Sequence, residues 1–117
     1  MVNGFLKSFL YALNGLRASL QGQRNLKIQI VIAFITIGAG FYFNIAAWEW
    51  CVILLTIGLV VGLELVNTAI ESLVDLVTRE RKPEAGRIKD IAAGAVLVVS
   101  AIALIVGVIV FRKYLVL

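Results

Sequence analysis

Histidine is absent from this 117-residue sequence, and cysteine, proline and methionine each occur only once. Without histidine, a single chain can build no Ser-His or Cys-His nucleophile and no histidine-ligated metal site. The lone cysteine, Cys51, excludes an internal disulfide and a cysteine metal cluster, and its apolar neighbours predict a small buried side chain. One proline and ten glycines also exclude a low-complexity tail.

Charged residues are scarce as well. Only 15% of the residues are charged and 62% are hydrophobic, whereas a soluble domain has about 25% charged residues. With a mean hydropathy of +1.02, this composition predicts an integral membrane protein, and the length allows one small domain over residues 1–117. The eleven Lys and Arg residues cluster beside hydrophobic runs. We therefore expect them to orient the chain in an anionic-lipid membrane rather than to bind nucleic acid.

The N-terminal segment, residues 4–22, has apolar residues at helical spacing with Lys7, Asn14 and Arg17 between them. Its apolar stripe is too interrupted to span a membrane and predicts an amphipathic helix in the membrane interface. A cleaved signal peptide is the alternative. It is disfavoured because no A-x-A-like site follows and the leading region is not basic.

Three apolar runs are long enough to cross a hydrocarbon core of about 30 Å, over residues 26–47, 48–78 and 87–113. The first ends in an aromatic cluster that suits the far interface. The second turns polar after Leu63, and the third has no charge between residues 91 and 111. The predicted fold is therefore an all-α membrane protein with a surface helix and three transmembrane helices.

The distribution of Lys and Arg predicts the orientation. Nine of them lie before or at the start of the first span, or between the second and third spans and at the start of the third, and none lies in the connection around residues 44–50. The positive-inside tendency places the N-terminus and the loop "TRERKPEAGR" in the cytoplasm. Arg112 and Lys113 would then lie outside, which argues mildly against this orientation.

The polar residues that interrupt the second span share one helix face. At 100° per residue they fall within a stripe about 100° wide, and they are Glu64, Asn67, Thr68, Glu71 and Asp75. With a rise of about 1.5 Å per residue, Glu64 lies about 21 Å beyond Trp50, inside the cytoplasmic leaflet, and Glu71 lies about 10 Å further. An acid within a span is a functional hypothesis by default.

Structural alternatives stay open for these residues. Glu71 and Asp75 could be solvated beyond the membrane edge and pair with Lys82 or Arg87. Glu64 and Asn67 could join helices of an oligomer, as polar side chains do between spans. A non-catalytic scaffold or a small ion-conducting bundle would use the stripe in these ways.

The chemistry of the stripe favours a hard cation. Carboxylates without histidine or cysteine suit Mg²⁺, which takes oxygen ligands and often shares them with nucleotide phosphates. Lys89 and Asp90, with Arg87 nearby, begin the third span and offer a phosphate contact and charge neutralisation. Neither G-x-x-x-x-G-K-[ST] nor G-x-G-x-x-G is present. ATP would therefore be bound outside the familiar soluble nucleotide folds.

The segment "ELVNTAIESLVD" (64–75) resembles the signature of the small prokaryotic diacylglycerol kinase family. That signature has Glu, two residues, Asn, Ser or Thr, Ala, an aliphatic residue, Glu, three residues and Asp. "RIKDIAAGAVLV" (87–98) resembles the second block of the family at the expected distance, and "GLRASL" and "RNLKIQ" resemble its N-terminal region. The resemblance implies a homotrimeric kinase of the bacterial inner membrane, with active sites shared between subunits. Such enzymes move the γ-phosphate of Mg-ATP to a lipid hydroxyl at the cytoplasmic interface.

The resemblance also implies roles for individual residues. Glu64 matches the general base and Glu71 a metal ligand, while Asn67 would orient Glu64 and the substrate. The residues expected to hold the nucleotide are Asp75, Arg87, Lys89 and Asp90. Gln23 stands where the family usually has a second metal-binding glutamate, and its amide offers a carbonyl oxygen without charge. This departure predicts weak metal binding, weak activity or a kinase-like relic.

The family has two substrate branches, one acting on diacylglycerol and one on undecaprenol. The segments "WEWCVILL" and "NTAIESLVDL" look closer to the undecaprenol branch. Undecaprenol is therefore the expected acceptor, with diacylglycerol as the alternative.

Overall fold

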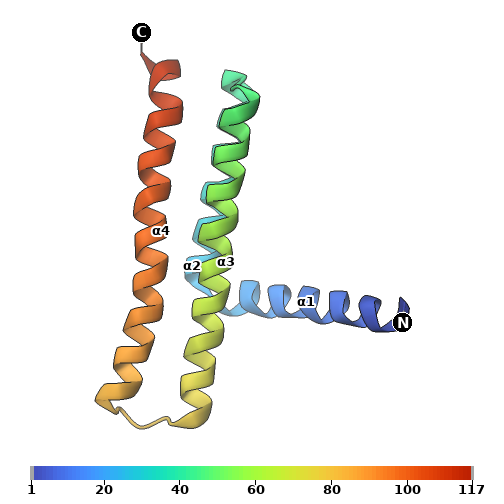
Figure 1. Cartoon of the computed structure of the whole chain (residues 1–117), viewed down its shortest axis with the longest axis vertical. Helices are drawn as coiled ribbons and strands as arrows, with labels where there is room; N and C mark the ends of the chain where they lie inside the picture. The colour runs from blue at the N-terminus through green and yellow to red at the C-terminus, as the bar shows by residue number, and fades with distance from the viewer. Residues whose placement is uncertain (1, 117) are drawn as a thin grey trace.

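The computed structural model describes residues 2–116, so the end residues 1 and 117 of the expected domain lie outside it. Its elements are four α-helices, α1 (Val2–Gly22), α2 (Arg24–Phe43), α3 (Ala47–Val77) and α4 (Pro83–Leu115). Figure 1 shows α3 beside α4, with α2 behind α3 and α1 projecting sideways from this bundle. The bundle helices α2, α3 and α4 are each long and apolar enough to cross a membrane. The predicted all-α membrane fold is thus confirmed.

The helix boundaries differ from the expected spans where local chemistry stops or starts a helix. α2 ends at Phe43 rather than near 47, because Asn44 adopts a left-handed conformation with φ 54° and ψ 55°. Asparagine is one of the few residues that tolerate this conformation. α4 begins at Pro83 rather than near 87, since the fixed φ of proline and its missing N–H suit the first turn of a helix.

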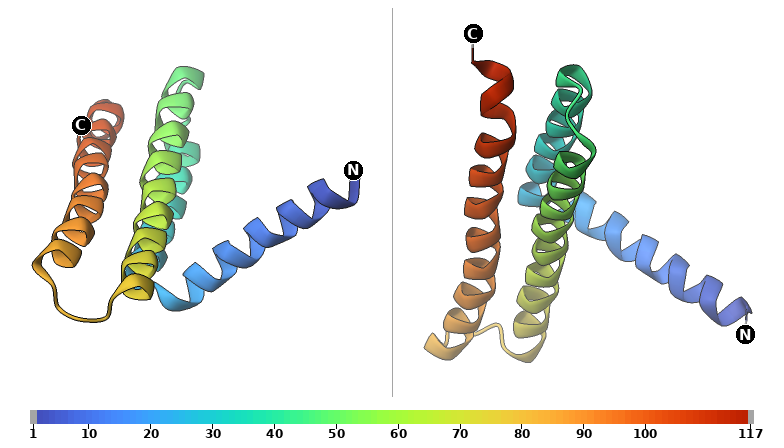
Figure 2. Two further views of the ribbon diagram at one scale, coloured as in Figure 1. Left: turned by 60° about the horizontal axis from the view of Figure 1, so that its bottom comes forward. Right: turned by 45° about the horizontal axis from the view of Figure 1, so that its top comes forward.

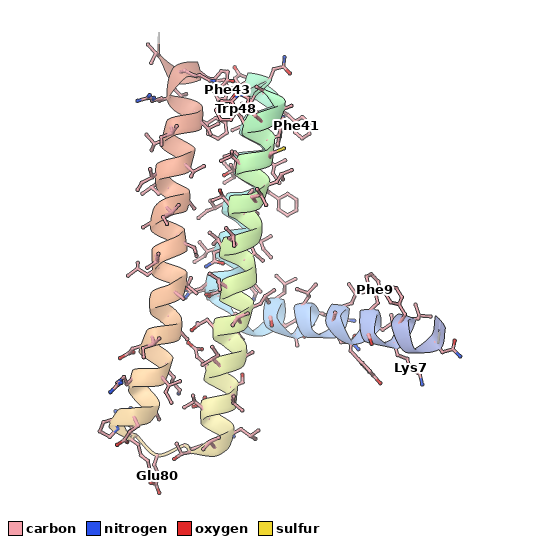
Figure 3. All side chains as sticks on the ribbon, viewed as in Figure 1. Lys7, Phe9, Phe41, Phe43, Trp48 and Glu80 are labelled. Atoms are coloured by element: carbon pink, nitrogen blue, oxygen red, sulfur yellow. The ribbon has the colours of Figure 1, made fainter. Side chains whose placement is uncertain are left out.

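The N-terminal helix α1 has the two-sided character that its sequence predicts. Figure 3 shows Phe9 and Lys7 on opposite sides of α1, with Lys7 on the side toward the α3–α4 loop. The large apolar residues of α1, Phe5 and Phe9 among them, are exposed in the single chain. Figure 2 shows α1 projecting away from the bundle in both views. This placement suits a helix that lies on the membrane surface.

Only three residues join α2 to α3, so the end of α2 and the start of α3 lie at the same level and the two helices run antiparallel. α2 has 20 residues and α3 has 31, so α3 extends about 16 Å past the start of α2. Figure 1 shows α3 and α4 continuing beyond the level of α1. By this measure Glu64 lies within the bundle, just short of the level of α1. Glu71 and then Asp75 lie beyond that level, toward the α3–α4 loop.

The buried core lies at the opposite end of the bundle from the α3–α4 loop. It consists of Ile45, Ile53 and Val110, with Phe43, Trp50, Phe111 and Tyr114 packed against it. A Cβ at Gly40 would lie 2.6 Å from the Trp50 ring, so the glycine permits the close approach of α2 and α3. Cys51 is exposed in the single chain, and the expectation of a buried cysteine was wrong.

Candidate active site

The polar stripe of α3 stays together as one face of the folded helix. Glu64 is 3% exposed and Asn67 is 8% exposed, although both are polar. Glu71 is half-buried and Asp75 is exposed. Thr68 donates its hydroxyl to the backbone carbonyl of Glu64 at 3.0 Å, so its oxygen is used within the helix. The face therefore grades from buried to solvated carboxylates along α3.

Asn67 contacts Glu71 rather than Glu64. Its Nδ2 donates to Glu71 Oε1 at 3.2 Å, whereas the family resemblance implied that the amide would orient Glu64. Within the described residues, the Asn67 Oδ1 is buried and has no hydrogen-bond partner. The Asn67 Nδ2 therefore holds the Glu71 carboxylate in place, and the Asn67 Oδ1 is left free for a ligand. A buried oxygen of this kind calls for a partner.

Gln29 of α2 is a site residue that the sequence analysis missed. Its side chain is half-buried and lies beside the Glu64 carboxylate. Within the described residues, Gln29 Oε1 is buried without a hydrogen-bond partner. The available signal was an amide in an otherwise apolar run, one and a half turns after Gln23. Glu64 and Gln29 therefore form a polar contact between α3 and α2.

Asp75 and Lys89 are brought together across the α3–α4 pair. Lys89 Nζ lies 2.6 Å from Asp75 Oδ1, so the alternative partners Lys82 and Arg87 were wrong for Asp75. Both side chains are more than one third exposed, and an ion pair in water contributes only about 0–1 kcal/mol. The pair therefore places a positive charge at the end of the stripe more than it stabilises the fold.

The α3–α4 connection surrounds an open cavity of about 500 Å³ beside this ion pair. Its charged lining residues are Asp75, Arg79, Glu80, Arg81, Lys82 and Lys89. Figure 3 shows Glu80 at the tip of this connection. Arg87 and Asp90 are exposed on the first turns of α4, and neither forms an ion pair within the described residues. A cavity with this excess of cations suits the phosphates of a nucleotide.

Gln23 lies at the break between α1 and α2. It is the half-buried N-cap residue of α2, and its side chain makes no capping hydrogen bond. No group of three or more acidic or cysteine side chains gathers anywhere in residues 2–116. Mg²⁺ often takes only one or two carboxylates and completes its shell with phosphates and water. The Glu71 carboxylate and the unpartnered Asn67 Oδ1 suit an ion of this nucleotide-borne kind better than a cage built of protein alone.

An apolar groove of about 550 Å³ runs between α2, α3 and α4. Its α3 lining includes Ile53, Ile57 and Val60, which fall on the same helix face as Glu64 at 100° per residue. Gln29 lines the groove at the end near Glu64, and Phe111 and Leu115 line it near the core. One face of α3 is thus apolar within the bundle and becomes acidic where the groove ends.

These features define a small helical membrane protein whose charged groups concentrate where an apolar groove meets the aqueous side. The prokaryotic diacylglycerol kinase family matches residues 10–111 of the chain. The chain belongs to this family, and it is a lipid kinase. The family indicated by the resemblance of residues 64–75 and 87–98 is thus confirmed.

Individual relatives extend the match over most of the chain. Undecaprenol kinase of Bacillus subtilis is 40% identical over 110 residues, which are 94% of this chain and 89% of that relative. A diacylglycerol kinase of Synechocystis is 42% identical over 103 residues, covering 87% of this chain and 59% of that relative. A diacylglycerol kinase of Haemophilus influenzae is 30% identical over 93 residues, covering 80% of this chain and 79% of that relative.

Proposed function

We propose that this lipid kinase transfers the γ-phosphate of ATP to the hydroxyl of undecaprenol at the cytoplasmic face of the bacterial inner membrane. The observation that carries the proposal is the single face of α3, which lines an apolar groove and turns acidic at Glu64. A lipid chain in the groove would end with its hydroxyl at the buried Glu64 carboxylate. The solvated end of the same face, with Asp75 and Lys89, would meet the nucleotide.

Glu64 is proposed as the general base. Its carboxylate would take the proton of the lipid hydroxyl while that oxygen bonds to the γ-phosphorus. The bond from the γ-phosphorus to the β–γ bridging oxygen breaks, and ADP leaves with the electron pair. Gln29, beside Glu64, can donate its amide N–H groups to either the carboxylate or the hydroxyl. Positioning and charge stabilisation dominate transfers of this kind.

Glu71 and the unpartnered Asn67 Oδ1 would hold the Mg²⁺ of the nucleotide, with the Gln23 amide as a further proposed ligand. When bound, Mg²⁺ neutralises charge on the transferring phosphates. Asn67 keeps the Glu71 carboxylate in place through the 3.2 Å hydrogen bond. Lys89, with Arg87 and the basic side chains of the loop cavity, would contact the phosphates, and Asp75 holds the Lys89 ammonium at 2.6 Å. Asp90 lies exposed one residue further along α4, within the proposed nucleotide region.

Two observations support undecaprenol over diacylglycerol. The Bacillus subtilis relative, named an undecaprenol kinase, aligns over 89% of its length at 40% identity. The groove is also one continuous slot between three helices, which suits one long chain better than two acyl chains. Diacylglycerol remains the second candidate because two relatives with that name are 42% and 30% identical.

The proposed orientation has α1 and the α3–α4 loop in the cytoplasm. Lys113 lies 3.0 Å from Glu49 Oε2, so one of the two cations that argued against this orientation is neutralised within the fold. The proposed assembly is a homotrimer. Neighbouring chains would cover the part of the acidic face that one bundle leaves open, since Glu71 is only half-buried here.

A vesicle assay tests the proposal. Purified chain in lipid vesicles receives labelled ATP with undecaprenol or diacylglycerol in parallel, and the phosphorylated lipid is counted. We expect faster transfer to undecaprenol, and a loss of about 10²–10⁴-fold in Glu64→Gln, the range that general bases contribute. Transfer that persists in Glu64→Gln would refute the role of Glu64. Faster transfer to diacylglycerol would reverse the substrate assignment.

A further inference from the structure

Glu49 is an acid buried far from the proposed active site, and no step of the proposed chemistry uses it. It lies in the first turn of α3 and is 0% exposed. Its Oε1 accepts hydrogen bonds from the Ala46 N–H at 3.0 Å and from the Tyr114 hydroxyl at 2.6 Å. Lys113 Nζ lies 3.0 Å from Oε2. We call this group of contacts the Glu49 tie; it joins the start of α3 to the end of α4.

Aromatic side chains pack around the Glu49 tie, in which Glu49 is buried and Lys113 is half-exposed. Lys113 Nζ lies 5.5 Å from the centre of the Trp48 ring and 5.2 Å from that of Tyr114. Phe43 stacks on Tyr114 with ring centres 5.7 Å apart, and Figure 3 shows Phe43 and Trp48 together at this end of the bundle. Hydrogen bonds that are shielded from water in this way are strong and directional.

Between its two ends, the α4 face that meets α3 carries no group that distinguishes one register from another. This face begins at Lys89 and ends at Tyr114, with steps of three or four residues. The residues between are Ala92, Val96, Val99, Ala103, Val106 and Val110. A slip of seven residues would present a similar apolar surface to α3. Within a membrane, apolar contact alone drives helix association weakly, and polar groups specify register.

The Glu49 tie and the Asp75–Lys89 pair lie at matched distances along the two helices. Glu49 and Asp75 are separated by about 39 Å along α3, and Tyr114 and Lys89 by about 38 Å along α4. Lys89 can therefore meet Asp75 only in the register in which Tyr114 meets Glu49. The Asp75–Lys89 pair is exposed, so it is too weak to set this register by itself.

We propose that Glu49 is a positioning residue: the Glu49 tie fixes the register of α4 against α3 and thereby holds Lys89 beside Asp75 at the nucleotide end. The consequence for ATP rests on the proposed function, but the register does not. Loss of the tie lets α4 slip or rotate, and the phosphate contacts of α4 move with it.

Spin labels on the exposed Leu76 and Ile88 measure the register directly. Leu76→Cys and Ile88→Cys are introduced after Cys51→Ser, and labelled chain is diluted with unlabelled chain so that distances within one chain dominate. A seven-residue slip moves α4 by about 10 Å along α3. In Glu49→Leu we expect a shifted or broadened distance, together with a KM for MgATP that rises several-fold while kcat falls less.

Matched variants separate register from general stability. Glu49→Gln keeps an acceptor for Tyr114 and Ala46, so it should retain the parent distance and KM. Ile45→Ala removes buried apolar atoms from the same end and should lower the Tm without moving the distance. Tyr114→Phe removes only the hydroxyl and serves if Glu49→Leu does not fold.

Three results overturn or divide the proposal. Parent distances in both Glu49→Leu and Tyr114→Phe would refute it. An equal distance change in Ile45→Ala would also refute it, because the effect would then be one of packing. If the distance changes in Glu49→Leu but the parent protein phosphorylates no lipid, the result would support the role of Glu49 in the helix register and refute the proposed function.

Discussion

Asn67→Asp tests whether Asn67 and Glu71 form a cation site. The substitution preserves side-chain shape but replaces the amide that donates to Glu71 Oε1 at 3.2 Å with a second carboxylate. Two like charges about 4 Å apart repel by about 1 kcal/mol in water and about 4 kcal/mol at an effective dielectric constant of about 20. Because Asn67 is buried and Glu71 half-buried, the loss of stability should fall between these values.

A divalent cation should reverse this loss, since two adjacent carboxylates are a better Mg²⁺ site than one carboxylate and an amide. The assay is thermal unfolding of Asn67→Asp in detergent, with EDTA or with millimolar Mg²⁺. We expect a Tm below that of the parent in EDTA and a larger rise with Mg²⁺ than the parent shows.

Two controls separate the site from the added charge. Ser72→Asp adds the same charge at an exposed neighbouring position and should show no comparable response to Mg²⁺. Asn67→Leu removes the donor without adding charge and should be destabilised in both buffers. A Tm of Asn67→Asp that equals the parent value in EDTA and does not respond to Mg²⁺ would refute the pairing of these residues as a cation site.

Three further predictions follow from single contacts. Gln23→Glu should lower the Mg²⁺ concentration for half-maximal activity, measured by titrating Mg²⁺ at fixed ATP; an unchanged titration excludes position 23 as a ligand. Lys89→Met should raise the KM for ATP several-fold with a smaller change in kcat, and an unchanged KM would contradict its phosphate contact. Gly40→Ala would place a Cβ 2.6 Å from Trp50 and should lower the Tm, whereas Gly58→Ala, with open space around it, should not.

The helices and the polar stripe could be predicted because both depend on local periodicity. An apolar run of about 20 residues predicts a spanning helix wherever it occurs, and a 100° turn per residue fixes which side chains share a face. Glu64, Asn67 and Glu71 therefore lie on one face in the structure, as expected. The largest differences are at the end of α2, by Asn44, and at the start of α4, at Pro83, where single residues determine the boundary.

The contacts between helices could not be predicted in the same way. Glu49 and Tyr114 are 65 residues apart in the sequence, and their meeting depends on the register of α3 and α4 rather than on any local pattern. Gln29 was overlooked for the same reason, because its partner Glu64 lies on another helix. The expected partners of Asp75 were Lys82 and Arg87, whereas the fold brings Lys89, two residues beyond Arg87, to Asp75.

The two ends of the bundle use their charged side chains in different ways. At the end near the core, Glu49 is fully buried with Lys113 as its partner, so the Glu49 carboxylate serves to join α3 to α4. At the other end, Asp75, Lys89 and the basic loop side chains remain in water around an open cavity, where the cationic groups can contact phosphates. Arg112 and Lys113 count against the proposed cytoplasmic placement of the N-terminus, because the positive-inside tendency counts Lys and Arg whether or not they are paired. Lys113 has a structural partner in Glu49 at that end, and the proposed orientation rests on the nine Lys and Arg residues near the other end.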